Sequence, residues 1–450
     1  YAKSLTEYFN SLATNLKHIQ ETCNFEIKNK VDQINSLAKQ ISTLTKQINT
    51  LEVNGGVAND LRDQRALLVD ELSEIANISV TEKKVGDGIG ITSYVVKLDH
   101  QTLVDTNNYK TLKVVPREKD EKANQNDADG LYDIVWEDGQ RFNPLSASLG
   151  GYLQSLFEIR DGNNLENLQG KANGTVGTNM VTLTNTTIND VEKLNIPEQG
   201  IITIDNKEYK YSNVTFAKNA SGKLEYTFTL ETNLVSDVTN ENAHIGESIN
   251  YKGIPYYMAQ MNEFIRTYAK VFNDIHRSGK DLNDQQGLDF FNGYDKVTGD
   301  NFDFSDPTNG YLEYYKVTAY NFTVTEAIYK DPSKIVTATS ITDGIEENDI
   351  VEKLIAIKED KSLFKQGQPA SFLQTLIAEI GIDSDKAKSF TNSQSNILSM
   401  ITNQRLSVSG VDIDEEAMNL IRYQNAYNLS AKAISVMDAI YNKLINEMAV

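Results

Sequence analysis

Apolar residues recur every seven positions near the start of the chain, and this is the strongest periodic pattern in the sequence. The repeat combines isoleucines with leucines three places further on: Ile27, Ile34, Ile41, Ile48, Leu37, Leu44 and Leu51. Isoleucine at one seam position and leucine at the other is typical of a coiled coil. Asn54, Gly55 and Gly56 then predict the end of this helix, because glycine accepts the left-handed backbone of a C-terminal cap. A second helix is expected from about residue 59, antiparallel to the first.

The spacing changes from helical to alternating after residue 81. Residues 81–143 predict strands separated by turns. Residues 167–253 are rich in Asn, Thr and Gly and contain KLEYTFTLE, in which Leu224, Tyr226, Phe228 and Leu230 share one face. The turn at 218–222 joins this run to the preceding one and predicts a β-hairpin. We interpret 167–253 as a β domain inserted between two helices.

Helical spacing returns at 152–162 and after Pro255, and it covers the chain from Pro369 to the end. Between the last two segments, residues 295–338 have a composition that favours strands. The C-terminal segment carries one more seven-residue series: Ile413, Leu420, Tyr427, Ile434, Tyr441 and Met448.

These elements predict an α+β multidomain fold, a long-helix bundle built from both chain ends and internal helices with inserted β-rich domains. The helical core domain is expected to combine 1–166, 254–294 and 339–450, and to include the β-rich segment 81–143. Residues 295–338 form the expected β-leaning second domain, and part of 81–143 is a candidate to join it. Residues 167–253 form the inserted β domain.

Composition narrows the classes of partner. The 450 residues carry a net charge of −20, which repels the phosphates of nucleic acid and anionic membranes. No run of 18 apolar residues exists, so membrane insertion is not expected. The only cysteine, Cys23, rules out an intramolecular disulfide. Because the sequence begins at Tyr1 and not at Met, we expect a fragment trimmed from a longer protein.

Four acids within five residues, Asp412, Asp414, Glu415 and Glu416, are the densest cluster of candidate ligands. No histidine lies near them, and one helical turn points their carboxylates in different directions. Asp412 stands three residues before Glu415 at the head of an apolar-striped helix, which is the spacing of a capping box. We therefore interpret Asp412 and Glu415 as a helix cap and predict no metal site.

The remaining polar motifs do not predict chemistry either. The four histidines are scattered, and neither QNDADG nor DLNDQQG has the ligand spacing of a calcium loop. No catalytic residue, cofactor or enzymatic activity is expected. A hydrolase that uses Asp127 and Asp129 remains the weakest of the alternatives.

The segment SGVDIDEEAMNLIRYQNAYNLSAKAIS (409–435) resembles the C-terminal signature of the bacterial flagellar axial proteins of the rod, the hook and the hook–filament junction. The core of that signature is represented here by Gln424, Asn425, Ala426 and Tyr427. Residues 61–80, 149–162 and 281–292 are similar to segments of the junction member of this family. The resemblance covers most of the predicted helical framework.

This resemblance implies a non-enzymatic structural protein of the extracellular flagellum, located at the hook–filament junction. Such proteins are exported by the flagellar type III apparatus without a cleaved signal peptide. The implied partners are further copies of the chain in a ring or helical zone, the hook protein, the next junction protein, and an export chaperone at the C-terminal helix.

The periodic stripes are the predicted packing and assembly positions: Ile34, Ile41, Ile48, Ile413, Leu420, Tyr427, Ile434 and Tyr441. An ordinary intramolecular core needs the same spacing, so the pattern does not separate core from assembly surface. Two other functions remain open. One is a hook or rod axial protein, and the other is a coiled-coil surface adhesin or scaffold that dimerises through the seam of residues 27–51.

Overall fold

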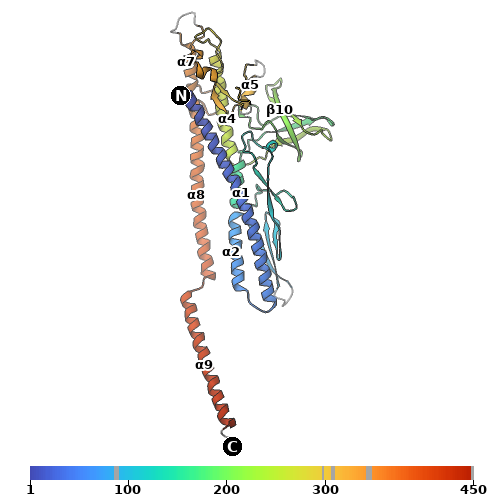
Figure 1. Ribbon diagram of the computed structural model, residues 1–450, viewed down its shortest axis with the longest axis vertical. Coiled ribbons are helices and arrows are strands. Elements are labelled where there is room, and N and C mark those ends of the chain that lie inside the picture. Colours follow the sequence, from blue (N-terminus) through green and yellow to red (C-terminus); the bar gives the residue numbers. More distant parts are fainter. Residues whose placement is uncertain (86–90, 296–297, 306–309, 341–346, 447–450) are drawn as a thin grey trace. The chain divides into compact units, whose positions relative to one another are not determined.

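The computed structural model describes the whole chain except residues 86–90, 296–297, 306–309, 341–346 and 447–450. The chain divides into two units, Tyr1–Phe372 and Leu373–Val450. Figure 1 traces the elements of both units in sequence colours. The predicted fold class is confirmed, because long helices alternate with inserted β-rich segments.

Two helices open the first unit and form the predicted hairpin. Helix α1 (Ala2–Val53) has 52 residues, and α2 (Asn59–Ile75) has 17. Gly55 adopts a φ of +79°, and its N–H bonds to the Glu52 carbonyl, so the glycine turn ends α1 as the sequence predicts.

Two antiparallel sheets follow the hairpin. The first has four strands in the order β1 (Ile78–Val85), β2 (Ile91–Leu98), β3 (Gln101–Asp105) and β4 (Asn108–Tyr109). The second pairs β5 (Leu112–Pro116) with β6 (Tyr132–Trp136), and the short 3₁₀ helix η1 (Lys119–Glu121) lies between these two strands in sequence.

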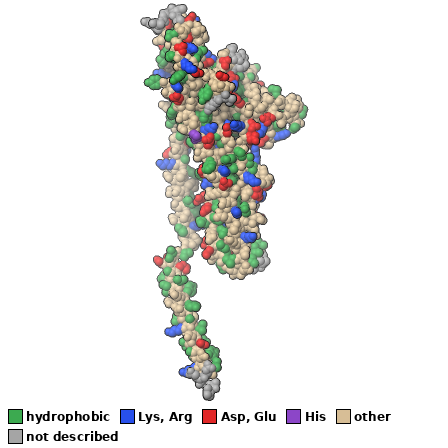
Figure 2. All heavy atoms as spheres, in the orientation of Figure 1, with side chains coloured by type: hydrophobic (Ala, Val, Ile, Leu, Met, Phe, Trp, Pro, Cys, Tyr) green, Lys and Arg blue, Asp and Glu red, His purple; other side chains and the backbone are tan. Residues whose placement is uncertain are grey.

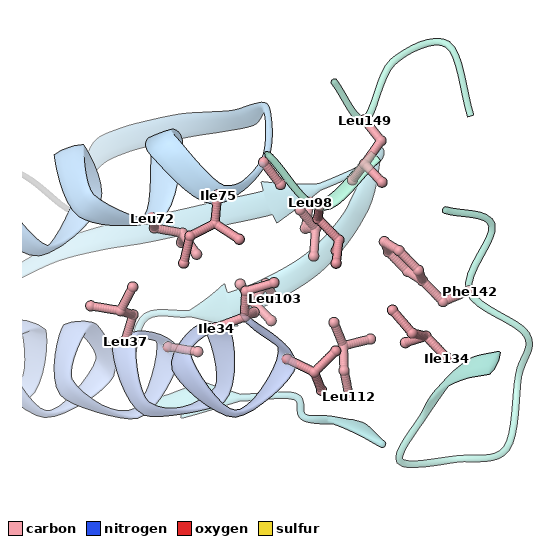
Figure 3. Close-up of a cluster of buried hydrophobic side chains, with 14 of the residues drawn as sticks. Ile34, Leu37, Leu72, Ile75, Leu98, Leu103, Leu112, Ile134, Phe142 and Leu149 are labelled. Atoms are coloured by element: carbon pink, nitrogen blue, oxygen red, sulfur yellow. The ribbon is translucent and has the colours of Figure 1, made fainter. Parts of the chain in front are cut away.

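The core of this region lies between the helices and the strands. Ile34 and Leu37 of α1 and Leu72 and Ile75 of α2 point toward Leu98 and its strand neighbours (Figure 3). Helix α3 (Gly151–Asp161) adds Leu153 and Phe157 to the same core. The seam isoleucines are therefore buried by other parts of the same chain.

The inserted β segment is a closed antiparallel barrel with the strand order β10-β11-β8-β7-β12-β9. Its strands are β7 (Gln169–Gly174), β8 (Met180–Thr184), β9 (Gly200–Ile204), β10 (Lys207–Lys218), β11 (Leu224–Leu230) and β12 (Val238–Ile245), with the 3₁₀ helix η2 (Val191–Lys193) between β8 and β9. The predicted hairpin is β10–β11, and the side chains of Leu224, Tyr226, Phe228 and Leu230 are buried in the barrel. All six strands lie within residues 167–253.

Helix α4 (Ile254–Arg277) returns the chain from the barrel to the helical part. The rest of the first unit consists of short elements: β13 (Phe291–Gly293), α5 (Gly310–Glu313), η3 (Tyr314–Lys316), β14 (Phe322–Val324), α6 (Glu326–Lys330), η4 (Pro332–Lys334), α7 (Asp349–Ala356) and η5 (Ile357–Glu359). The β13–β14 pair is a two-stranded antiparallel sheet.

Residues 310–316 differ from the β-leaning expectation for 295–338, because they form α5 and η3. Tertiary packing determines the secondary structure of this segment. Tyr314 stacks on Phe304 with 4.0 Å between the ring centroids, and Tyr315 packs into the barrel core. Tyrosine favours strands, but the whole scale of strand propensity spans only about 1 kcal/mol, so contacts of this kind override it.

The C-terminal unit consists of most of α8 (Pro369–Ser409) and of α9 (Ile413–Asn446). Helix α8 passes through Gly381 without a break, whereas Gly410 lies between the two helices. At the N-terminal end of α8, Pro369 and Phe372 are buried in the first unit. The other described residues of both helices are exposed or half-buried.

A fully buried arginine connects α4 to the barrel. All five N–H donors of Arg266 bond to neutral oxygen atoms: the carbonyls of Glu192, Leu194, Tyr315 and Val317, and Oε1 of Gln125. Burial lowers the pKa of Arg266 to about 10, because water is removed from its charge. These five bonds hold together α4, η2, η3 and the segment after η1.

Replacement of Arg266 should therefore destabilise the first unit strongly. Arg266→Met leaves buried carbonyls without donors, and we expect the free energy of unfolding to fall by at least about 3 kcal/mol. Lys270→Met is the matched control on the same helix. Its ion pair with Glu192 is partly exposed, so a loss below about 1 kcal/mol is expected. Urea unfolding followed by circular dichroism compares the two, and equal losses would contradict this account of Arg266.

His276 at the end of α4 is held in its neutral form. Its side chain is fully buried, with Nδ1 2.6 Å from the Leu288 carbonyl and Nε2 3.0 Å from the Val336 N–H. The carbonyl requires a proton on Nδ1, and the N–H requires a lone pair on Nε2. Burial lowers the pKa of His276 below its ordinary 6.5.

Because the neutral imidazole is the folded form, its contribution to stability is complete above pH 6.5. It is lost as the pH falls from 6.5 through the lowered pKa, with a slope of up to about 1.4 kcal/mol per pH unit. We expect His276→Gln to be less stable at pH 7 but to lose less further stability between pH 7 and pH 5 than the unchanged chain. Parallel pH profiles of the two proteins would contradict this assignment.

Candidate assembly site

The structure separates the eight predicted packing and assembly positions into two groups. Ile34, Ile41 and Ile48 of α1 have exposed fractions of 0%. The five positions on α9 are exposed by 60% or more: Ile413, Leu420, Tyr427, Ile434 and Tyr441. The α1 positions are thus core residues of the first unit, and the α9 positions form an apolar surface.

Helix α9 is apolar on two sides. The first side is the predicted series of five residues. Met418, Leu429 and Val436 each stand two residues from a member of that series, which places them about 160° around the helix. They too are exposed by more than half. Figure 2 shows hydrophobic side chains along the face of α9 that is in view.

Helix α8 also exposes large apolar side chains along the part that belongs to the C-terminal unit. They are Ile377, Ile380, Ile382, Phe390, Ile397, Leu398, Met400, Ile401, Leu406 and Val408. Monomeric proteins rarely leave apolar surface of this extent in water, and such surface marks contact with another molecule.

Asp412 caps α9. Its Oδ1 accepts hydrogen bonds from the backbone N–H groups of Asp414 at 2.9 Å and of Glu415 at 3.3 Å. Glu415 thus takes part through its backbone, and its carboxylate adds negative charge to the first turn, where the helix dipole favours it. Within the described residues, no group of three or more His, Cys, Asp or Glu side chains could hold a metal ion.

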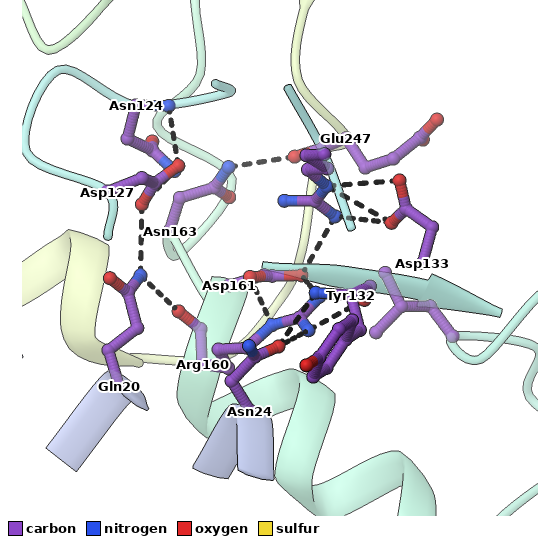
Figure 4. Close-up of polar contacts among 12 residues, drawn as sticks. Gln20, Asn24, Asn124, Asp127, Tyr132, Asp133, Arg160, Asp161, Asn163 and Glu247 are labelled. Atoms are coloured by element: carbon purple, nitrogen blue, oxygen red, sulfur yellow. Dashed lines mark hydrogen bonds and ion pairs between the residues drawn. The ribbon is translucent and has the colours of Figure 1, made fainter. Parts of the chain in front are cut away.

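Asp127 and Asp129, the pair in the hydrolase alternative, have separate surroundings. Asp127 is buried and accepts hydrogen bonds from Gln20 and Asn124 (Figure 4). Burial, together with the nearby charge of Asp161, raises the pKa of Asp127. Asp129 is exposed and pairs with Lys122 at 2.7 Å. These partners give both carboxylates structural roles.

A buried ionic network lies beside Asp127 (Figure 4). Arg160 has an exposed fraction of 0% and bonds to both carboxylate oxygens of Asp161, to the Asn24 side chain and to the Tyr132 carbonyl. Burial raises the pKa of Asp161, but Arg160 and Arg117 outweigh it and keep the pKa below its ordinary value. The network joins α1 to α3 and β6.

Sequence reasoning missed the second apolar side of α9 and the buried arginines. The seven-residue series follows only one side of a helix, although the two-residue offset of Met418, Leu429 and Val436 was available as a signal. Arg160 and Arg266 occur in helices whose other Lys, Arg, Asp and Glu residues are half-buried or exposed, so no local pattern marks these two as fully buried.

None of the helices in the described parts of the chain is both long enough and apolar enough to span a membrane.

Comparison with protein families gives two matches. Residues 1–200 match the flagellar hook-associated protein FlgK helical domain, and residues 399–447 match the C-terminal domain of the flagellar basal body rod FlgEFG proteins. The second match contains α9 and the end of α8.

Three curated relatives are each a flagellar hook-associated protein 1. The protein of Bacillus subtilis is 24% identical over 451 residues, which cover 100% of this chain and 70% of the relative. The protein of Escherichia coli is 29% identical over 124 residues, 27% of this chain and 22% of the relative. The protein of Salmonella typhimurium is 35% identical over 72 residues, 16% of this chain and 13% of the relative.

A solved structure, the flagellar hook junction protein FlgK from Burkholderia pseudomallei, is 15% identical to this chain. The alignment covers 91% of this chain and 88% of that one, with a TM-score of 0.47. The two family models match opposite ends of the chain. The chain is thus similar to flagellar hook-associated protein 1 over its whole length, and its two ends resemble domains of flagellar proteins.

Proposed function

We propose that copies of this chain pack together through α8 and α9 and so build the zone that joins hook to filament. The observation that carries this proposal is the exposed apolar surface of α9, which occupies two opposite sides of the helix. A helix that is apolar on more than one side requires neighbours on more than one side. One partner helix would cover only one of them.

A ring or helical zone of copies supplies such neighbours. Each copy then contacts one neighbour on either side, and a closed arrangement multiplies contacts that are individually weak. Burial of one Leu, Ile or Met side chain contributes about 1.5–3 kcal/mol. Several such side chains on α9 would together contribute favourable free energy against the loss of translational and rotational freedom on association.

Similarity to flagellar hook-associated protein 1 supports a set of further partners. We propose that the assembled zone contacts the hook protein on one side and the next junction protein on the other. Before assembly, an export chaperone would cover the C-terminal helix, since α9 exposes large apolar side chains along its length. Export to the extracellular flagellum would use the type III route without a cleaved signal peptide.

The coiled-coil adhesin or scaffold has less support, because its dimer would need the seam of residues 27–51. Ile27, Ile34, Ile41 and Ile48 are all fully buried by the chain itself. A hook or rod location is the second candidate, since the C-terminal match is to rod proteins. The match of residues 1–200 to a hook-associated protein favours the junction.

The assembly surface can be tested with Leu420→Asp combined with Ile434→Asp. Loss of two buried apolar contacts should weaken association between copies at least about 100-fold. Asn428→Asp combined with Ser435→Asp is the matched control, because it adds the same charge at two exposed polar positions of α9 that belong neither to its two apolar sides nor to the signature core. Association is measured by light scattering of the full-length protein. Equal effects of the two double variants would contradict the proposal.

The location can be tested in cells that lack the gene. We expect electron microscopy to show hooks without filaments, with free flagellin in the medium. The Leu420→Asp, Ile434→Asp variant should fail to restore filaments, whereas the control variant should restore them. If hooks were missing, the protein would be assigned to the rod or hook. Normal filaments would contradict an axial function.

A further inference from the structure

A cavity of about 410 Å³ lies beside α1 in the unit Tyr1–Phe372. Helix α1, the segment 122–127 and the segment 316–321 each supply part of its lining. Its volume falls within the roughly 300–1,000 Å³ of small-molecule sites. None of its lining residues belongs to α8 or α9, so the cavity is separate from the proposed assembly surface.

Three lysines from three different segments line this cavity: Lys17, Lys122 and Lys316. Their convergence runs against the net charge of −20. Lys122 Nζ lies 2.7 Å from Asp129 Oδ1, and Lys316 Nζ lies 2.7 Å from Glu313 Oε2. Both pairs are partly exposed, so each is weak and a ligand carboxylate can take the place of the protein carboxylate.

The rest of the lining combines donors, acceptors and aromatic rings. Nδ2 of Asn126 is buried and has no hydrogen-bond partner within the described structure. Glu198 and Asp295 supply carboxylate oxygens. The ring of Tyr320 adds an apolar face, and Lys17 Nζ lies 5.8 Å from its centroid.

A hydroxyl group both donates and accepts hydrogen bonds, so a ligand rich in hydroxyls satisfies the amide and the carboxylates together. Inorganic phosphate and sulfate are mainly acceptors, so they match the lysines and the Asn126 amide but not the carboxylates of Glu198 and Asp295. A pyranose ring in addition presents C–H groups to an aromatic face. The lining therefore combines the features that recognise a hydroxylated ring with those that recognise an anion.

We propose that this cavity binds an acidic sugar. The lysines hold its carboxylate, and Asn126, Glu198 and Asp295 bond to its hydroxyls. The ring lies against Tyr320. This assignment does not depend on the assembly function of α8 and α9.

The test uses D-glucuronate as the probe and D-glucose as its neutral counterpart, titrated into the full chain by isothermal calorimetry. We expect saturable binding of D-glucuronate and at least about ten-fold weaker binding of D-glucose, because charged hydrogen bonds to the carboxylate are lost. Lys122→Met combined with Lys316→Met should weaken D-glucuronate binding by about ten-fold or more.

Lys39→Met combined with Lys46→Met is the control, because it makes the same change in charge at two exposed positions of α1. Binding should be unchanged in this variant. The proposal is overturned by any of four results: no saturable binding of D-glucuronate, equal binding of both sugars, equal weakening by both double variants, or competition by inorganic sulfate as strong as by D-glucuronate. The last result would identify a simple anion site.

Discussion

The burial of one side of α1 is the constraint on which the rest of the first unit depends. Most of the stability of a helix in a protein comes from the packing of its apolar side, so that side of the 52-residue α1 must be covered along its length. Different segments cover different stretches. Phe9 stacks against Phe264 of α4, Ile34 packs against the strands, and Asn49 bonds to the Thr92 backbone. Segments more than 200 residues apart in sequence are thereby placed along one common axis.

Polar groups complete this interior in two different ways. Arg160 is paired with the carboxylate of Asp161, so its charge is neutralised where it lies. Arg266 has only neutral oxygens as acceptors, and five hydrogen bonds from its guanidinium group stabilise its charge. The first arrangement joins α1 to its neighbours, and the second joins α4 to the barrel. Hydrogen bonds depend on direction and apolar contacts do not, so these arginines fix the register in which the apolar surfaces meet.

The sequence predicts those elements whose side-chain spacing directly reflects a buried face. The seam of α1, the glycine turn at Gly55 and the alternation in β11 are of this kind. Closure of the barrel is not predictable in this way, because β7 pairs with β12, which lies 64–75 residues further along the chain. Of the candidate site, spacing shows that Ile41 and Tyr427 both need cover, but it does not show whether the cover comes from the same chain. The exposed fractions in the structure distinguish the two residues, because Ile41 is buried and Tyr427 is exposed.

Closure of the barrel also limits unwanted backbone pairing between copies of the chain that come close to one another. An open sheet leaves a row of unpaired backbone groups on each outer strand, and such edges join those of identical neighbours. In the barrel, β9 pairs with β10 and completes the circle, so no strand is left with a free edge. On β1, which does form an outer edge, Lys83 and Lys84 discourage strand addition by their charge. Many copies can then stand side by side at high local concentration without merging into a continuous β-sheet aggregate.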